Sequence, residues 1–452
     1  MESTLSKTEL LKKCEELGMV KYKSKKKSEL ITLLQQIQKQ DIDVEGKAIY
    51  VEGKDIDVEG KAMTFIDLFC GIGGFHQALT NIGCNCVFAS DIDKHCRETY
   101  ETNYGIQPEG DIQTIDIDSI PPFDILCAGF PCQPFSKAGF QKGFNDTRGN
   151  LFFHICKIVE RHKPKYLLLE NVRNLASHDN GNTWNVIQSA IRELGYHTYD
   201  SPVLLNVLHF NIPQNRERAV IMCKRVDVGE LPTLPPIHKN PKTTLTKFVR
   251  DIIDENITDV KLTGKMKYVH DIWDAFITIL DENKKEIPKF PIWTDWWDNS
   301  IDETDEFYLK YKSWIDKNRE FYVQHFDILH PWLSESRKNK HWTGAVRKFE
   351  WQAGDVCEEN NRLHKCLWTA RGSGIRVKKC DYIPTLVAMS MIPIYGPKNR
   401  KLTPIELLRL QSFRDAFKYD EKHIYKQLGN AVNVKMIEQC AKFLLYNEPL
   451  FE

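Results

Sequence analysis

The chain has 452 residues, and its 62 basic side chains balance 62 acidic ones, so its net charge is zero. A chain of this length holds about two or three domains, and its neutrality means that any surface for a polyanion must be local. We expect an intracellular protein with free thiols and no signal peptide or transmembrane segment. Its 13 cysteines are irregularly spaced, its start lacks a signal-peptide pattern, and no apolar run approaches the roughly 18 residues of a membrane span.

The first 40 residues predict a small helical module. Apolar positions at helical spacing favour helices over residues 7–17 and 28–38, and a lysine-rich connection that ends at Lys27 joins them. The pattern resembles the SAP-like helix-extended-helix modules that bind nucleic acid, and a solvated helical hairpin is the alternative. We favour DNA binding for this module.

Residues 41–62 repeat one short unit. The segment that begins at Asp41 recurs almost unchanged from Asp55, and each copy contains a glycine. Because these glycines argue against a coiled coil, we expect a flexible linker that marks a domain boundary.

From Met63 to Lys224, apolar segments alternate with amphipathic ones, which is typical of a parallel α/β sheet. Cys84 and Cys86 are the only close pair of cysteines in this part, and without further ligands at suitable spacing we expect no metal site. We expect strands over residues 65–69, 86–90, 123–128, 166–169 and 219–223, and helices over 74–82, 151–162 and 184–194.

A glycine-rich turn follows the first expected strand, at residues 71–74 directly after Phe69, where a ligand can approach the backbone. Asp91 ends the second strand about 20 residues on, where an acidic side chain typically binds ribose hydroxyls. Asp111 and Ile112 offer an acceptor and an apolar wall for an adenine. Because the glycine pattern of pyrophosphate sites is absent, we favour a nucleoside ligand, and S-adenosylmethionine fits that description.

Cys132 lies between Pro131 and Pro134, just after the third expected strand. The prolines fix the backbone on both sides of the cysteine, and the neighbouring Gln133 and Ser136 are polar, which a core turn would not need. A buried cysteine that acts as a small hydrophobe is the alternative. We favour a thiol presented as a nucleophile.

The fourth expected strand ends at Glu170. If the third and fourth strands are parallel, Glu170 and Cys132 emerge at the same edge of the sheet, where open α/β folds bind ligands. An exposed, helix-capping Glu170 is the alternative. Arg216 and Arg218, just before the strand over 219–223, add positive charge beside this edge, although arginines at a strand start are commonly solvated.

Beyond Lys224 the alternation stops, and every tryptophan except Trp184 lies between Trp273 and Trp368. We expect a second globular unit inserted into the first, with most of its tryptophans in its core and not stacked on bases. After it, helices expected over residues 404–411 and 434–446 return to the first unit.

Six sequence blocks together resemble the DNA (cytosine-5)-methyltransferase family, over residues 64–224 and 371–446. The resemblance implies an α/β, Rossmann-like, S-adenosylmethionine-dependent catalytic domain made of residues 63–224 and 396–452, with a target recognition domain at 225–395. The blocks are Phe69-Cys-Gly-Ile-Gly-Gly74, Gly129-Phe-Pro-Cys-Gln-Pro-Phe-Ser136, Glu170-Asn-Val172, Gln214-Asn-Arg-Glu-Arg218, Arg409-Leu-Gln411 and Gly429-Asn430.

The resemblance also implies a mechanism and a cofactor pocket. Cys132, as a thiolate that Arg218 helps to form, would add to C6 of a flipped-out cytosine, while protonated Glu170 shares its proton with N3 and C5 takes the methyl group. Arg216 would complete the catalytic group. The cofactor pocket would be lined by Phe69, Gly71, Asp91, Ile92, Asp111, Ile112, Pro131, Leu151, Asn430 and Val432.

The expected substrate is double-stranded DNA with a short specific site, methylated by a monomer in the cytoplasm or wherever that DNA lies. A cognate restriction endonuclease is a candidate partner. The RNA-modifying branch of the family is one alternative, but its recognition region is usually compact, and the long region here favours DNA. A catalytically silent DNA-binding homologue is another alternative, against which the intact Cys132, Glu170, Arg216 and Arg218 argue.

Overall fold

The structure is a computed structural model, and it describes residues 62–131, 151–237, 245–257, 261–298, 303–354, 362–388 and 391–451. By its internal contacts the chain divides into two units, residues 1–53 and 54–452, and every described residue belongs to the second. The expected N-terminal module, the linker as far as Lys61 and the loop that contains Cys132 lie outside the described residues. The boundaries of the expected domains stay a prediction.

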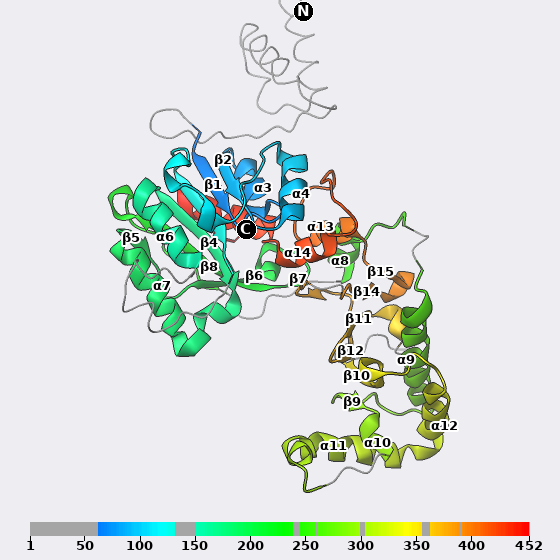
Figure 1. Cartoon of the computed structure of the whole chain (residues 1–452). Helices are drawn as coiled ribbons and strands as arrows, with labels where there is room; N and C mark the ends of the chain where they lie inside the picture. Colours follow the sequence, from blue (N-terminus) through cyan, green and yellow to red (C-terminus); the bar gives the residue numbers. More distant parts are fainter. Residues whose placement is uncertain are drawn as a thin grey trace, which may run out of the picture. The chain divides into compact units, whose positions relative to one another are not determined.

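A seven-stranded sheet contains all five strands expected between Met63 and Lys224, although the third begins later and the last is longer at both ends (Figure 1). The strands lie in the order β2-β1-β3-β4-β8-β5, and β6 pairs with β8 outside this path. Their bounds are β1 Thr64–Leu68, β2 Asn85–Ser90, β3 Ile125–Gly129, β4 Tyr166–Val172, β5 Tyr196–Thr198, β6 Val203–Asn206 and β8 Glu217–Arg225.

The expectation of a parallel sheet is wrong on one side of this sheet. β1 to β4 run parallel, whereas β8 is antiparallel to β4, β5 and β6. The connection from β6 to β8, residues 207–216, is shorter than the crossover of about a dozen residues that a parallel neighbour needs. Because β8 runs antiparallel, its first residues lie where β4 ends, and Arg218 pairs with Val172.

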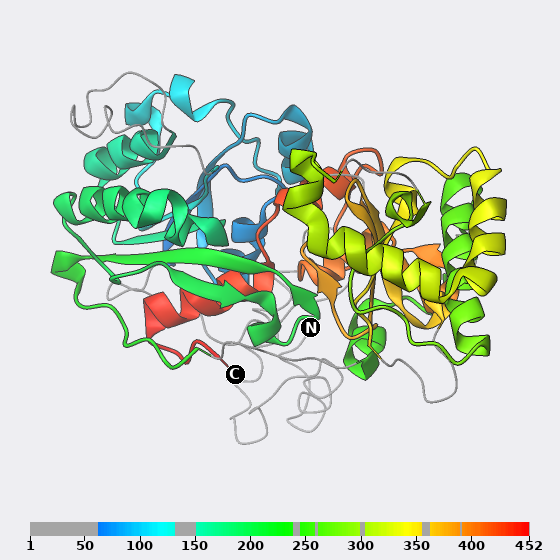
Figure 2. The same ribbon diagram turned by 90° about the horizontal axis from the view of Figure 1, so that it is seen from below.

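Helices cover both faces of this sheet and confirm the helices expected there. α3 and α15 pack on one face, and α6 and α7 pack on the other, as Figure 2 shows for α15 against α6 and α7. Successive residues of a strand point to opposite faces of the sheet. Phe65 therefore belongs to the core under α3 and α15, and Ile66 belongs to the core under α6 and α7. The helices are α3 Gly74–Asn81, α4 Lys94–Tyr104, α6 Leu151–His162, α7 Asn182–Glu193 and α15 Val434–Tyr446.

A six-stranded second sheet has the order β15-β14-β11-β12-β10-β9, and α9 and α12 pack against one of its faces. The strands are β9 Ile292–Trp293, β10 Lys348–Trp351, β11 Leu367–Arg371, β12 Gly374–Lys378, β14 Ile394–Tyr395 and β15 Arg400–Lys401. The nearby helices are α8 Leu245–Ile252, α9 Gly264–Glu282, α10 Asp295–Asp298, α11 Glu306–Gln324 and α12 Phe326–Arg337.

Most tryptophans of this region fill its core, as the sequence predicts. Trp273 is fully buried and stacks on Phe349, with 4.4 Å between ring centroids. Trp314 differs, because half of its surface is exposed. The other buried tryptophans of the region are Trp296, Trp297, Trp332, Trp342, Trp351 and Trp368.

The cysteines that the structure describes are free thiols, and all but Cys86 are buried. In the same residues, no three or more His, Cys, Asp or Glu side chains are grouped so that they could hold a metal ion. None of the helices described is both long enough and apolar enough to cross a membrane.

The C-terminal stretch returns to the first sheet. Its helices are α13 Pro404–Leu410, α14 Ile424–Asn430 and the long α15, which packs against α3. Beside it, the short strands β7 Gln214–Asn215 and β13 Ile383–Pro384 pair in parallel.

A buried ion pair anchors this stretch to the end of α8. Arg400 donates to both oxygens of Glu406, at 2.7 and 2.8 Å, and neither side chain is accessible to solvent. Glu406 also accepts from the backbone N–H groups of Thr403 and Asp254. One buried carboxylate therefore accepts four hydrogen bonds, two of them from Arg400.

Replacing Glu406 should therefore destabilise the protein strongly. We expect Glu406→Ala to lower the free energy of unfolding by about 3–5 kcal/mol, because the charge of Arg400 stays buried without its partner. The control Asp415→Ala removes the exposed partner of Arg409 and should cost at most about 1 kcal/mol. Urea denaturation measures both values, and equal losses would contradict the prediction.

Candidate active site

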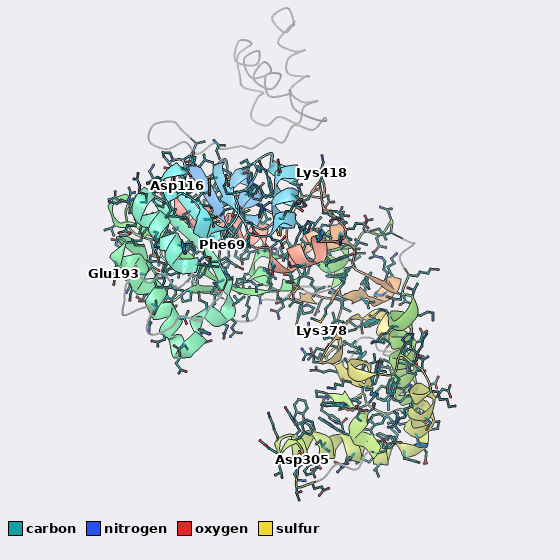
Figure 3. All side chains as sticks on the ribbon, viewed as in Figure 1. Phe69, Asp116, Glu193, Asp305, Lys378 and Lys418 are labelled. Atoms are coloured by element: carbon teal, nitrogen blue, oxygen red, sulfur yellow. The ribbon has the colours of Figure 1, made fainter. Side chains whose placement is uncertain are left out.

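The turn after β1 adopts a backbone that leaves one side open. Phe69 and Gly71 both have positive φ angles of 54°, and Figure 3 labels Phe69. A methyl group built on Gly71 would meet no atom within 4 Å, whereas at Gly74 it would lie 2.6 Å from a methyl carbon of Val432. Gly71 is therefore the position where a ligand can approach the backbone, and Gly74 is needed for packing against the C-terminal stretch.

Asp91 ties this turn to the end of β2. One carboxylate oxygen accepts from the N–H of Gly71 at 2.8 Å, and the other accepts from the N–H of Asp93 at 2.7 Å. Burial raises the pKa of Asp91, and these two hydrogen bonds partly oppose the rise. Each oxygen keeps a further lone pair for a ligand hydroxyl.

The remaining expected cofactor residues differ in burial and come from several elements. Ile92 follows Asp91 and is 73% exposed, while Ile112 is buried. Asp111 caps the short turn Ile112–Thr114 by accepting from the N–H of Gln113. Pro131 and Asn430 are exposed, Leu151 begins α6 half-buried and Val432 is buried against Gly74.

These residues fit S-adenosylmethionine in three respects. The turn at Gly71 is open, the carboxylate of Asp91 retains acceptor capacity, and Ile92 offers an exposed apolar surface. Direct contacts join Gly71 to Asp91 and Val432 to Gly74. For the others, the structure gives the element and the burial.

Glu170 lies inside β4, and the alternative of an exposed helix cap is wrong. It is 7% exposed and pairs with Gly129 of β3, which runs parallel to β4. Its carboxylate accepts from Nε of Arg218 at 2.8 Å. Burial raises the pKa of Glu170, and the charges of Arg218 and Arg216 oppose this only in part.

Cys132 lies outside the described residues, but the chain that leads to it is described. Gly129, the partner of Glu170, precedes Cys132 by three residues. The side chain of Asn171 donates to the carbonyl of Phe130 at 2.9 Å and so holds this segment against the end of β4. Sequence reasoning assigned no role to Asn171, although a buried polar residue next to Glu170 could have indicated one.

Arg216 contacts the backbone of two distant segments. Its fully buried guanidinium donates to the carbonyls of Leu386, Gly429 and Ala431, at 2.9, 3.1 and 2.7 Å. These contacts support a positioning role, and the catalytic role expected from the sequence stays a prediction. Its charge still acts on the pKa of Glu170.

A cavity of about 630 Å³ opens beside Arg218. Arg173 and Arg371 also line it, as do Asn215 and Thr385, which share a 2.7 Å hydrogen bond. Sequence reasoning missed Arg371, because it comes from β11 and nothing in the spacing of the chain connects it with Arg218. We name this cavity the catalytic pocket, after the role that is proposed for it below.

The α/β sheet, with its open turn after β1 and the acid that ends β2, places the chain among the S-adenosylmethionine-dependent methyltransferases. Sequence comparison narrows this class. The family described as C-5 cytosine-specific DNA methylase matches residues 63–445, and the chain belongs to this family.

Named relatives agree with this assignment. The chain is 51% identical to the type II methyltransferase M.HpaII of Haemophilus parainfluenzae, over 84% of this chain and 89% of that protein. It is 30% identical to M.AluI of Cellulosimicrobium cellulans, over 84% and 91%. A shorter stretch, 37% of this chain and 50% of the relative, is 51% identical to M.HhaI of Haemophilus parahaemolyticus.

The protein is thus a sequence-specific DNA cytosine-5 methyltransferase that uses S-adenosylmethionine as methyl donor. This confirms the function, the fold class and the cofactor expected from the sequence. Of the readings considered above, the comparisons support the DNA enzyme.

The contacts of Arg216 make a prediction about stability. A lysine in its place has one ammonium group and cannot reproduce the planar fork that reaches three carbonyls. We expect Arg216→Lys to lower the free energy of unfolding by about 1–3 kcal/mol, through buried carbonyls left without a donor. Urea denaturation tests this, with Arg192→Lys, at an exposed position of α7, as a neutral control. A fully stable Arg216→Lys protein would contradict the assignment.

Proposed function

We propose that Cys132 and Glu170 carry the methyl transfer, by covalent catalysis on a cytosine taken out of the duplex. The sulfur of Cys132, as a thiolate, bonds to C6. The electron pair of the C5–C6 double bond forms a C4–C5 double bond, and the pair of the C4–N3 double bond moves to N3, which takes the proton of Glu170. C5 thereby becomes nucleophilic. S-adenosylmethionine supplies the methyl group that C5 accepts. Loss of the C5 proton to solvent then re-forms the C5–C6 double bond, breaks the S–C6 bond and frees Cys132, while N3 returns its proton to Glu170.

The burial of Glu170 is the observation that carries this proposal. A carboxyl group in water is ionised at neutral pH and has no proton to share, but desolvation disfavours the charged form. The pKa of Glu170 is raised although Arg218 lies 2.8 Å away. This environment suits an acid that donates to N3 and is restrained in position by an arginine.

The catalytic pocket supports extraction of the base. C5 and C6 cannot be reached inside a stacked duplex, so the cytosine must leave it at a cost of a few kcal/mol. The pocket offers three arginines, Arg173, Arg218 and Arg371, for the phosphates near the displaced nucleotide. One of them, Arg173, is paired with Glu217 at 2.7 Å.

The domain assignments and partners belong to the same proposal. Residues 63–224 and 396–452 form the catalytic domain, residues 225–395 recognise the target sequence, and residues 1–40 add DNA affinity through the linker 41–62. The protein acts inside the cell as a monomer, and a cognate restriction endonuclease cuts the unmethylated site.

Replacing the nucleophile tests the covalent step. We expect Cys132→Ser to reduce methyl transfer to background and to abolish the adduct with DNA that contains 5-fluorocytosine, because a hydroxyl is a far weaker nucleophile at neutral pH. The matched control Cys86→Ser changes a half-buried thiol in β2 and should retain both. Undiminished methyl transfer from labelled cofactor in Cys132→Ser would refute the mechanism.

Replacing the acid tests the role of Glu170. Glu170→Gln should lower kcat by about 10²–10⁴-fold, since an amide can donate a hydrogen bond but cannot give up its proton. In the wild type, activity should fall as pH rises through the raised pKa of Glu170, because the protonated form is then lost. The variant should lack this alkaline fall. Single-turnover rates across pH measure both effects, with Glu160→Gln on α6 as control.

The same pKa shift affects stability in a defined direction. A raised pKa in the folded state means that folding favours protonated Glu170, so the wild type loses this contribution as pH rises through the folded value. Glu170→Gln should lack this alkaline loss, so the difference in stability between the variant and the wild type should shift in favour of the variant as pH rises. In the single-turnover measurements described above, an alkaline fall in activity that persists in Glu170→Gln would exclude Glu170 as the source of that fall.

A further inference from the structure

The two faces of the second sheet differ in character. Across the paired strands, Trp293 of β9 stands opposite Lys348 of β10, and Glu350 of β10 stands opposite Arg376 of β12. Thr369 of β11 continues the row on the other side of Arg376. Because strand side chains alternate, the residues between them form the opposite face, which is the core under α9 and α12. That core includes Ile292, Phe349, Ile375, Val377 and Trp368.

An aromatic pocket lies between this polar face and α11. Its volume is about 350 Å³, and Trp293 and Trp296 line it together with three aromatic residues of α11. Spaced at i, i+4 and i+7, those three share one side of the helix. They are unusually exposed, at 43% for Phe307, 37% for Tyr311 and 50% for Trp314. Core filling explains the buried tryptophans of this region, but it does not explain these three side chains.

Two cationic side chains line the aromatic pocket. Nζ of Lys348 lies 3.3 Å from the centre of the Trp293 ring, and Arg376 lines the pocket while it pairs with Glu350 at 3.0 Å. Burial lowers the pKa of Lys348, and the charge of Asp295 opposes this. A planar aromatic ligand with an attached negative group would match both the aromatic and the cationic side chains of this pocket.

Shared lining residues connect the aromatic pocket with the catalytic pocket by way of a third cavity. Arg376 also lines a small cavity together with Lys378 and Arg371, and Arg371 lines the catalytic pocket as well (Figure 3 labels Lys378). The pKa values of Arg371 and Lys378 are lowered, first by burial and then by neighbouring positive charge. A polyanion bound across these cations would reduce their mutual repulsion, and the DNA substrate is such a polyanion.

We propose that the aromatic pocket binds one nucleotide of the DNA substrate outside the double helix, with its base against Trp314 and Tyr311 and its phosphate near Lys348 and Arg376. A base inside the duplex is stacked on both faces and cannot enter such a pocket, whereas a displaced base can stack on aromatic side chains. The nucleotide is not the target cytosine, which belongs in the catalytic pocket. In this respect the inference rests on the proposed function.

A set of bulged duplexes tests the inference with the full chain. After bisulfite sequencing has located the methylated cytosine, duplexes are made with one unpaired nucleotide at successive positions on either side of it. We expect one position of the unpaired nucleotide to tighten binding to the wild type by about tenfold. The unpaired base need not be unstacked from a base pair before it binds, and it can still stack on the aromatic side chains of the pocket. Trp314→Ala should lose this gain.

The matched control is Leu309→Ala, on the same helix and 62% exposed but not part of the aromatic pocket, which should keep the gain. A second variant, Lys348→Gln, should reduce the slope of log affinity against log salt by about one for the bulged duplex. Because Trp314 is half exposed and does not belong to the core under α9 and α12, its replacement should leave that core intact.

Two outcomes would overturn the inference. One is that no bulge position favours the wild type over Trp314→Ala. The other is that Trp314→Ala changes the oligomeric state in sedimentation and leaves DNA affinity untouched, which would make the pocket a protein interface. Methylation of the unbulged duplex, measured in the same samples with the wild type and with Cys132→Ser, tests the proposed function separately. Transfer that requires Cys132 but shows no bulge preference would remove this inference alone.

Discussion

The antiparallel pairing of β8 with β4 is the constraint on which the catalytic site depends. It brings the beginning of β8 to the edge of the sheet where β3 and β4 end, so that Arg218 meets the buried carboxyl of Glu170. A parallel β8 would have carried Arg218 to the opposite edge. The same reversal places Arg216 where it can reach the C-terminal stretch. One short connection, between β6 and β8, therefore determines the surroundings of the proposed acid.

The C-terminal stretch completes the site from far along the chain. Val432 packs on Gly74 and lies close to Gly129, so one side chain lies against the start of α3 and the end of β3. Gly429 lies against the backbone of Val387, where a methyl group would come within 2.3 Å of a backbone carbon. Arg216 hydrogen-bonds both of these segments. Close packing thus holds together the turn after β1, the segment after β13 and the end of α14. This packing explains why glycine occurs at positions 74 and 429.

The second sheet uses aromatic residues in two physical roles. On its inner face, Trp273 and its neighbours exclude water and stabilise the helices that cover the sheet. On the other face, Trp293 lies under a lysine, and α11 presents exposed rings such as Trp314. The strand period of two separates these roles within single strands, since Ile292 points into the core and Trp293 away from it. A region that looks uniformly rich in tryptophan therefore contains both a core and a surface suited to a ligand.

The sequence alone determined five strands of the first sheet, the glycine turn after β1 and the acid that follows β2, because these depend on local periodicity and on residue types at strand ends. It also indicated the family through the order of its blocks. It could not determine the direction of β8, the positioning role of Arg216 or the presence of Arg371 in the catalytic pocket. Each of these depends on which distant segments come together, and local patterns carry no information about that. Glu170 shows the division most clearly: the sequence marked it as the carboxylate that ends a strand, and only the tertiary structure, by burying it beside Arg218, decided the direction of its pKa shift.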